Sequence, residues 1–138
     1  MRCANILLIF FSFLSLMKIE CKESPLHGKG VFAITDIQRD ELIEVCPVLL
    51  LSKQDTKEID KTRLYNYYFS WKEGGCAISL GYGSLYNHSY EPNARYEKDF
   101  LNSRILFKSI RPIRKGEEIT VNYNGDPNSK EVVWFEKR

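Results

Sequence analysis

The sequence predicts a mostly-β domain, and three observations support this. Short segments rich in β-branched and aromatic residues recur along the chain, separated by Gly, Pro and Asn turns, which is the pattern of a β-rich fold. Eight Tyr and eight Phe among 138 residues suit a β core or an aromatic-lined pocket. Little of the chain has a helical pattern, and its length is that of one ordinary domain.

The first half of the chain contains three predicted strands. Residues 18–23 alternate weakly, and the turn cluster SPLHGKG then leads into a short strand at residues 31–34. Residues 42–51 are rich in leucine and β-branched residues but contain Pro47. Because proline has no ladder donor, we expect a sheet edge or a bulge there. Residues 52–63 are polar and lysine-rich, which predicts a solvated loop or a short surface helix.

The second half alternates strands and turns in the same way. The segment YNYYFSW at residues 65–71 is strongly β-prone, and Gly74-Gly75 ends it. Further strands are predicted at residues 76–80, 105–110 and 118–123. The last residues, 129–137, have the pattern of a short capped helix.

The apolar N-terminus stands apart from the rest. Residues 4–17 read ANILLIFFSFLSLM, which is too short for a standard membrane span and close to a signal-peptide core. No small-x-small cleavage site follows, and Lys18 comes at once. A start artefact or disordered lead, a natural start at Met17, and a signal or anchor all remain open. We therefore separate residues 1–16 as a leader from a domain at 17–126 and a C-terminal helix at 127–138.

Charge and cysteine usage limit the function classes. The formal net charge of +2 lacks the strong basic bias of a dedicated nucleic-acid binder. No two cysteines form a Cys-x-x-Cys pair, so a zinc knuckle is not expected and the thiols are predicted to be free and mostly buried. The cysteines are Cys3, Cys21, Cys46 and Cys76.

The stretch SLYNHSYEPNARYE, at residues 84–97, contains His88, one of two histidines. A zinc site needs three protein ligands, and neither HxH nor HxxxH is present. A Ser or Cys nucleophile is equally unsupported, since no GxSxG elbow occurs. The polar, Pro-containing stretch instead offers irregular backbone to a ligand, as does Gly28-Lys29-Gly30 upstream. A half-buried structural histidine is the alternative.

Four segments in order resemble the motifs of one family, the SET-domain protein lysine methyltransferases. HGKGVFA (27–33) resembles its first glycine motif, and YNHSYEPN (86–93) its Asn-His-Ser-x-x-Pro-Asn motif. GEEITVNYNG (116–125) resembles the closing motif, and YNYYFSW the aromatic strand of the lysine channel. The resemblance covers about residues 18–125 and is nearest to the short viral and bacterial members.

This resemblance implies small β-sheets with a C-terminal pseudo-knot and a short final helix. It implies that S-adenosylmethionine is the cofactor and that no metal is needed. The cofactor would contact the backbone of His27, Gly28 and Lys29, the side chain of Asn87 and the backbone of His88.

The substrate lysine would enter from the opposite face, through an aromatic channel. Tyr123 would place its hydroxyl beside the transferring methyl, and Tyr67 or its neighbour Tyr68 would line the channel and bind the amine. Tyr96 falls where the family has a Tyr or Phe that limits the number of methyls. Strand packing is the alternative role for each tyrosine.

The sequence departs from many nuclear members of the family, which have a cysteine-rich zinc segment before the domain and Cys-x-Cys-x4-Cys after it. The site must therefore be closed differently. Trp134 and Phe135 are predicted to cover the adenine and the channel mouth, and packing on the body of the domain is the alternative.

The resemblance implies a protein substrate with a lysine side chain, and a histone tail is one candidate. No direct nucleic-acid contact is required, and no membrane unless the leader is real. An exposed strand at residues 45–51 would allow a homodimer. The expected location is intracellular, nuclear or chromatin-bound, or host-directed, with secretion left open by the leader. A non-catalytic SET-like binding module and a secreted or host-delivered effector are the alternative functions.

Overall fold

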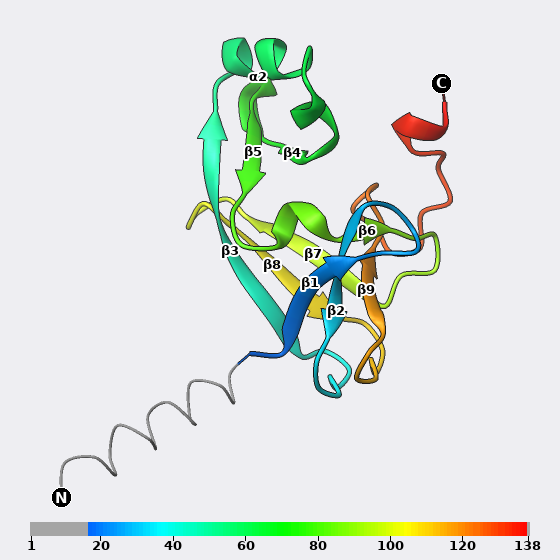
Figure 1. Ribbon diagram of the computed structural model, residues 1–138. Helices are drawn as coiled ribbons and strands as arrows, with labels where there is room; N and C mark the ends of the chain where they lie inside the picture. The colour runs from blue at the N-terminus through cyan, green and yellow to red at the C-terminus, as the bar shows by residue number, and fades with distance from the viewer. Residues whose placement is uncertain (1–16, 138) are drawn as a thin grey trace, which may run out of the picture.

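The structure, a computed structural model, describes residues 17–137, so the predicted leader at residues 1–16 lies outside it. Two curled sheets make up most of the molecule, which confirms the mostly-β prediction (Figure 1). The smaller sheet has the order β1-β2-β9-β6 and the larger the order β4-β5-β3-β8-β7. The strands are β1 (Ile19–Glu23), β2 (Lys29–Ala33), β3 (Leu42–Leu51), β4 (Tyr68–Ser70), β5 (Cys76–Ser79), β6 (Asn87–His88), β7 (Ala94–Asp99), β8 (Arg104–Ser109) and β9 (Glu118–Val121).

Pro47 lies where β3 changes its partner. Residues before it pair with β8, and Val48–Leu51 pair with β5. The register shift of β3 lies between Leu42 and Glu44, so no bulge occurs at Pro47. Pro47 is paired with Arg104 of β8 and with no residue of β5, so the predicted edge holds locally although β3 is an inner strand of the sheet. Proline is tolerated because the ladder changes sides here, and its carbonyl still accepts the Leu80 N–H at 3.0 Å.

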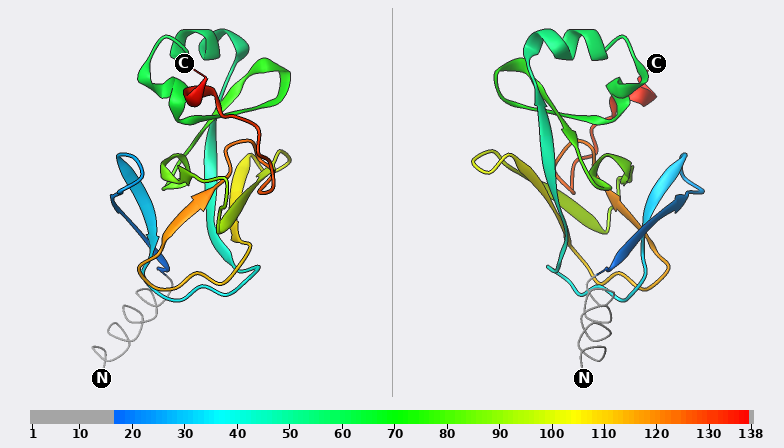
Figure 2. Two further views of the ribbon diagram at one scale, coloured as in Figure 1. Left: turned by 90° about the vertical axis from the view of Figure 1, so that its right-hand side faces the viewer. Right: turned by 60° about the vertical axis from the view of Figure 1, so that its left-hand side comes forward.

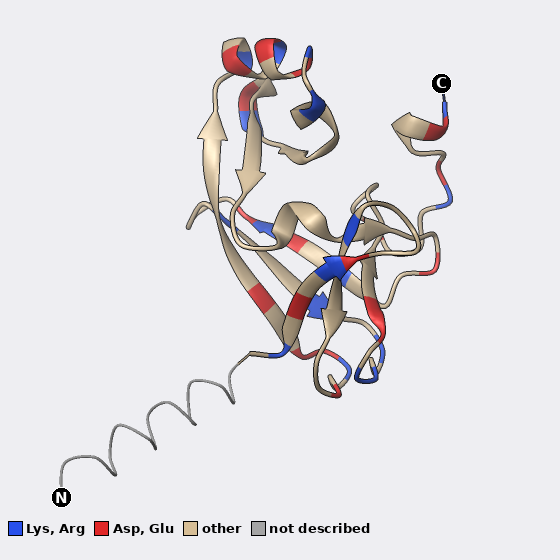
Figure 3. Ribbon diagram, in the orientation of Figure 1, with Lys and Arg blue, Asp and Glu red and all other residues tan. Residues whose placement is uncertain are grey.

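The polar stretch after β3 forms the surface helix α2 (Lys53–Ile59). Ser52 and Asp55 make a capping box, in which each side chain accepts the other's backbone N–H. Thr56 is the buried residue of this helix, and both signs of charge share its exposed surface (Figure 3). No helix within residues 17–137 is both long and apolar enough to cross a membrane.

The sequence predicted one strand over YNYYFSW, but the structure does not form one there. The first residues of this segment form the 3₁₀ helix η1 (Arg63–Asn66), and β4 begins only at Tyr68. The reason is local: the Thr62 side chain accepts the Leu64 N–H and caps a helical turn. Two further 3₁₀ helices, η2 (Lys72–Gly74) and η3 (Gly83–Leu85), flank β5.

The C-terminal residues form turns and irregular structure, and only η4 (Trp134–Glu136) is helical. The capped helix predicted at 129–137 is therefore wrong in extent and in capping, since no side chain caps η4. Asparagine side chains shape the segment instead: Asn122 donates to the Ser129 carbonyl and Asn124 to that of Glu131. The chain end thereby returns to the region of η1 (Figure 2).

The core lies where the two sheets face each other. Ile105 and Phe107 of β8, Val31 of β2 and Ile119 of β9 are all fully buried. Cys21, Cys46 and Cys76 have free thiols; those of Cys46 and Cys76 are buried, as predicted, whereas Cys3 lies outside the described residues. The core is thus built on strands from both ends of the chain.

Strand β9 is held from both sides. It pairs antiparallel with β2 and parallel with β6, which brings the closing motif beside YNHSYEPN. The Asn93 side chain donates to the Glu118 carbonyl at 2.8 Å and accepts the Thr120 N–H at 2.9 Å. Buried polar groups need hydrogen-bond partners, and Asn93 bonds to one backbone carbonyl and one backbone N–H of β9 at once. This side chain therefore fixes the register of β9 in addition to the backbone pairing. This close packing of the C-terminal stretch fits the implied pseudo-knot.

His88 extends the pairing of β6 with β9. Its Nδ1 accepts the Tyr123 N–H at 3.1 Å, just beyond the point where Ser89 donates to the Val121 carbonyl. Its imidazole is therefore structural, as in the alternative that the sequence left open, whereas the backbone contact of His88 with a cofactor stays a prediction. Burial lowers the pKa of His88, although the nearby Glu136 carboxylate opposes the shift.

We predict that His88 makes stability pH-dependent. An unfolded histidine has a pKa of about 6.5, and the pKa of His88 in the folded protein is lower. As the pH falls, the unfolded chain therefore binds this proton before the folded protein does. The contribution is complete above about pH 6.5 and is lost as pH falls from there through the lowered pKa. Urea unfolding between pH 8 and pH 5 should show a steeper loss for the wild type than for His88→Asn, which keeps an acceptor that does not titrate. Parallel curves would contradict the assignment.

Candidate functional site

Two neighbouring cavities share part of their lining, which we call the shared wall. The larger has a volume of about 950 Å³ and the smaller about 320 Å³. The residues that line both are Asn66, Tyr67, Ser84, Tyr123 and Trp134. The two cavities therefore meet at these side chains.

The larger cavity collects every residue predicted to bind the cofactor. It lies between the β1–β2 turn, strand β6 and the C-terminal segment. Gly28 adopts a φ of +48°, and a Cβ there would meet nothing within 4 Å, so its backbone borders open space. The predicted residues that line the cavity are His27, Gly28, Lys29, Asn87, His88 and Trp134.

Asn87 organises the β1–β2 turn. Its amide nitrogen lies 3.1 Å from the carbonyls of His27 and Lys29 and 2.7 Å from Oε1 of Glu118. The side chain predicted to contact the cofactor thus also shapes the backbone of the first glycine motif. The two motifs depend on each other although they are far apart in sequence.

Glu118 is the site residue that sequence reasoning missed. Both of its carboxylate oxygens lie 2.8 Å from Ser24 Oγ, and Asn87 donates to Oε1. Gly30 makes room for it, because a Cβ at Gly30 would lie 2.2 Å from that oxygen. The available signal was an acidic residue at the head of an otherwise buried strand, and this does not reveal a partner 94 residues earlier.

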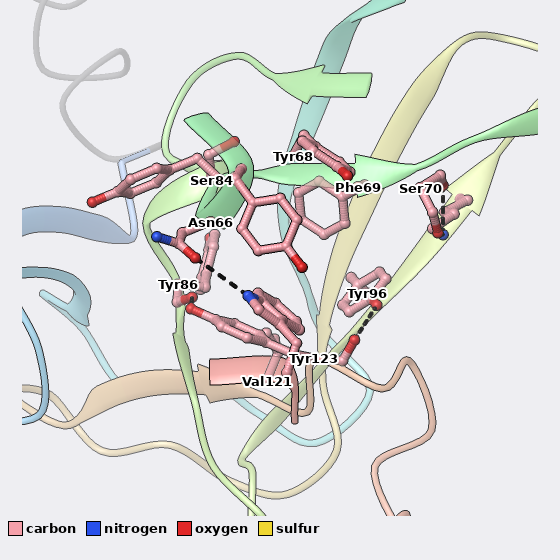
Figure 4. Close-up of a pocket in the computed structure, with 14 residues that line it drawn as sticks. Asn66, Tyr68, Phe69, Ser70, Ser84, Tyr86, Tyr96, Val121 and Tyr123 are labelled. Atoms are coloured by element: carbon pink, nitrogen blue, oxygen red, sulfur yellow. Dashed lines mark hydrogen bonds between the residues drawn. The ribbon is translucent and has the colours of Figure 1, made fainter. Parts of the chain in front are cut away.

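The smaller cavity is lined mainly by aromatic rings (Figure 4). Tyr123 stands at its centre: its hydroxyl donates to the Tyr86 carbonyl at 2.8 Å, and the Trp134 ring stacks on it at 5.5 Å and 17°. The Tyr96 hydroxyl donates to the Tyr123 carbonyl at 3.2 Å. The predicted channel residues lining it are Tyr67, Tyr68, Tyr96 and Tyr123.

The candidate pair Tyr67 and Tyr68 have different positions. Tyr67 borders both cavities and is 40% exposed. Tyr68 borders only the smaller one, and its hydroxyl donates to Asp60 at 2.8 Å. Tyr67 is therefore the better candidate for contacting an amine at the shared wall.

Burial raises the pKa of three phenols around the smaller cavity, those of Tyr68, Tyr96 and Tyr123. Burial raises the pKa of Tyr123 to about 12, and nearby Tyr67 and Glu118 act in the same direction. Burial, followed by the hydrogen bond to Asp60, raises the pKa of Tyr68 to about 12. Burial also raises the pKa of Tyr96. These hydroxyls can donate hydrogen bonds but carry no charge.

Lys98 shows how this cavity treats an amine. It lines the cavity, and its ammonium donates to the carbonyl and the hydroxyl of Ser70 at 2.8 and 3.2 Å. Burial nevertheless lowers the pKa of Lys98. Desolvation disfavours the charged form of a lysine, so the same surroundings favour a neutral amine on any lysine that enters.

Tyr90 holds the C-terminal segment against the domain by hydrogen bonds. The Tyr90 hydroxyl donates to Glu136 at 2.8 Å and accepts the Val133 N–H, while Lys130 donates to the Tyr90 carbonyl. Val133 is 1% exposed and anchors the segment in the body of the domain.

Trp134 and Phe135 are held against the site in this way. Trp134 Nε1 donates to Asn66 at 3.2 Å, and the Phe135 ring contacts those of His88 and Tyr123. Both residues line the larger cavity. Among residues 17–137, no three His, Cys, Asp or Glu side chains are grouped to hold a metal ion.

Known proteins share both the sequence and the fold. The SET-domain family model matches residues 28–124. A Schizosaccharomyces pombe histone-lysine N-methyltransferase, specific for H3 lysine-37, is 35% identical over 119 residues, which are 86% of this chain and 77% of that protein. An Arabidopsis thaliana histone-lysine N-methyltransferase is 33% identical over 78% of this chain, but only 7% of its own length is matched.

A solved structure supports the same conclusion. The crystal structure of a Plasmodium falciparum histone methyltransferase is 31% identical, with a TM-score of 0.66 over 86% of this chain and 96% of the other. The family match runs from Gly28 in the β1–β2 turn to Asn124 and includes most of the residues that line the two cavities, whereas His27, Trp134 and Phe135 lie outside it. The chain belongs to the SET-domain family.

Proposed function

We propose that this protein transfers a methyl group from S-adenosylmethionine to a lysine amine of a protein substrate. The observation that carries the proposal is the wall shared by the two cavities, with Tyr123 and Trp134 in it. A cofactor on one side and a lysine on the other would meet only there. The names of the matched relatives favour a histone as the substrate and chromatin as the place of action.

The residues of the larger cavity fit S-adenosylmethionine. Open backbone at Gly28 suits a close approach, and the rings of Trp134 and Phe135 suit an adenine. The neutral His88 carries its proton on Nε2, because Nδ1 accepts a hydrogen bond. That Nε2 is buried and has no hydrogen-bond partner among the described residues. When bound, the cofactor supplies a methyl group on a positively charged sulfur.

The smaller cavity favours the neutral form of the substrate lysine amine and positions it. A free lysine, with a pKa of about 10.4, is mostly protonated at neutral pH, and only the neutral amine can attack the methyl carbon. The burial that lowers the pKa of Lys98 acts on the guest amine in the same direction. Tyr123 is held by Tyr86 and Trp134, so the amine meets a fixed hydroxyl. Positioning and desolvation therefore supply the catalysis.

Removing the Tyr123 hydroxyl tests this function. Tyr123→Phe keeps the ring stacked on Trp134 but loses the bond to the Tyr86 carbonyl, and we expect methyl transfer to fall ~100-fold. Labelled methyl from S-adenosylmethionine would be followed into purified histones. Ile113→Val, a core change outside both cavities, should leave transfer unchanged. No labelled protein with the wild type, or full activity of Tyr123→Phe, would refute the proposal.

Glu118 gives a separate test of the cofactor cavity. Glu118→Gln puts an amide where two donors, Ser24 and Asn87, need an acceptor, so the β1–β2 turn should loosen. We expect S-adenosylhomocysteine to bind ~10-fold more weakly by calorimetry. Glu117→Gln, next in the chain but paired with Arg111 at the surface, should change affinity less than ~2-fold. Equal affinities of the two variants would refute this role.

Tyr96 is proposed to limit the number of methyl groups. Its hydroxyl occupies cavity space and is bonded to the Tyr123 carbonyl at 3.2 Å. Tyr96→Phe removes that hydroxyl, and the extra room should shift products from mono- toward di- and trimethyl-lysine. Mass spectrometry of the methylated histone measures the ratio; an unchanged ratio would show that Tyr96 serves packing alone.

A homodimer through β3 stays a prediction. Val45 and Leu49 expose 41% and 56% of their surface on this strand, although its backbone is paired with β5 and β8. These exposed side chains are the apolar surface that such a dimer would cover.

A further inference from the structure

The segment of residues 81–86 walls both cavities. Gly83, Ser84 and Tyr86 line the smaller cavity, and Ser84 and Leu85 line the larger. Whatever fixes this segment therefore fixes the relative position of both proposed ligands. The segment contains η3 and is not itself a sheet strand, so its backbone must be held by other means.

One carboxylate holds both ends of this segment. Glu44 of β3 accepts the Tyr82 N–H on Oε1 at 2.9 Å and the Tyr86 hydroxyl on Oε2 at 2.8 Å. The approach is close: a Cβ at Gly81, whose φ is +67°, would lie 2.6 Å from Oε1. The glycine is thus required both by its conformation and by the carboxylate beside it.

Tyr86 carries the constraint to the catalytic tyrosine. Its ring is 2% exposed and stacks on Phe107 at 4.2 Å and 11°. Burial raises the pKa of Tyr86 well above its usual value, so the hydroxyl stays protonated and donates to Glu44. The carbonyl of the same residue accepts the Tyr123 hydroxyl at 2.8 Å.

We propose that Glu44 is a positioning residue for methyl transfer. Through the Tyr82 N–H and the Tyr86 hydroxyl, its carboxylate sets the carbonyl that holds the Tyr123 hydroxyl at the shared wall. Glu44 itself lines neither cavity. This inference rests on the proposed function. A small shift of a reacting group can cost on the order of 100-fold in rate, so the constraint matters more for turnover than for binding.

The first test separates turnover from binding. Glu44→Gln keeps an acceptor for the Tyr82 N–H but disturbs the bond from Tyr86, and Tyr86→Phe removes that bond from the other side. Each should lower kcat ~10- to 100-fold, with peptide KM and cofactor affinity within ~3-fold of the wild type. Because both variants break one interaction, the double variant should be no slower than the worse single variant. Multiplicative losses, or unchanged kcat, would overturn the proposal.

A matched control separates positioning from stability. Ile113→Val removes a methyl group from a core residue that is 1% exposed and lines neither cavity. Rates would be compared well below the Tm of the least stable variant. Ile113→Val should lower Tm and leave kcat unchanged. If kcat falls in proportion to Tm in every variant, Ile113→Val included, then Glu44 has only a structural role. If Glu44→Gln does not fold, Tyr86→Phe provides the same comparison.

The second test needs no activity. With ¹³C-labelled tyrosine, the Tyr123 ring signal is assigned by its loss in Tyr123→Phe. Glu44→Gln should shift this signal, whereas Ile113→Val should not. An unshifted signal overturns the positioning role whether or not methyl transfer is found. If the wild type transfers no methyl group but the signal shifts, the proposed function fails while the linkage of Glu44 to Tyr123 stands.

Discussion

The site depends on the capture of β9 between β2 and β6. Asn93 fixes the register of this strand with one side chain, and His88 continues the pairing as far as Tyr123. Glu118 at the start of β9 shapes the larger cavity, and Tyr123, beyond its end, lies in the shared wall. A slip of β9 by one residue would turn each of its side chains to the other face of the sheet and displace both groups. The contacts that stabilise β9 are therefore the same contacts that fix the geometry of the site.

Local sequence patterns predicted most of the strands and the family motifs. β-branched and aromatic runs between glycine, proline and asparagine turns are short-range signals, and most of the predicted strands were present. The exceptions arose where a cap or a tertiary contact decided the conformation. Thr62 turned the start of YNYYFSW into η1, and the asparagine side chains bond to backbone carbonyls of a C-terminal segment that is irregular except for η4.

The candidate site was predictable where it coincided with motifs. All ten of the residues assigned by resemblance to the cofactor or the channel line one cavity or the other, and the contacts that hold them were not predictable. Glu118 meets Ser24, and Glu44 meets Tyr86, 42 positions later. No local pattern relates such pairs, because they become neighbours only when the sheets assemble. The imidazole of His88 is a similar case, since its partner is a backbone N–H 35 residues away.

Lys98 has a wider implication for how the smaller cavity works. The Lys98 amine donates to Ser70, yet burial still lowers its pKa. The shift therefore comes from the residues that line the cavity and needs no bound substrate. In the function we propose, a substrate lysine would exchange bulk water for these same aromatic surroundings, so its pKa would fall for the reason that lowers the pKa of Lys98.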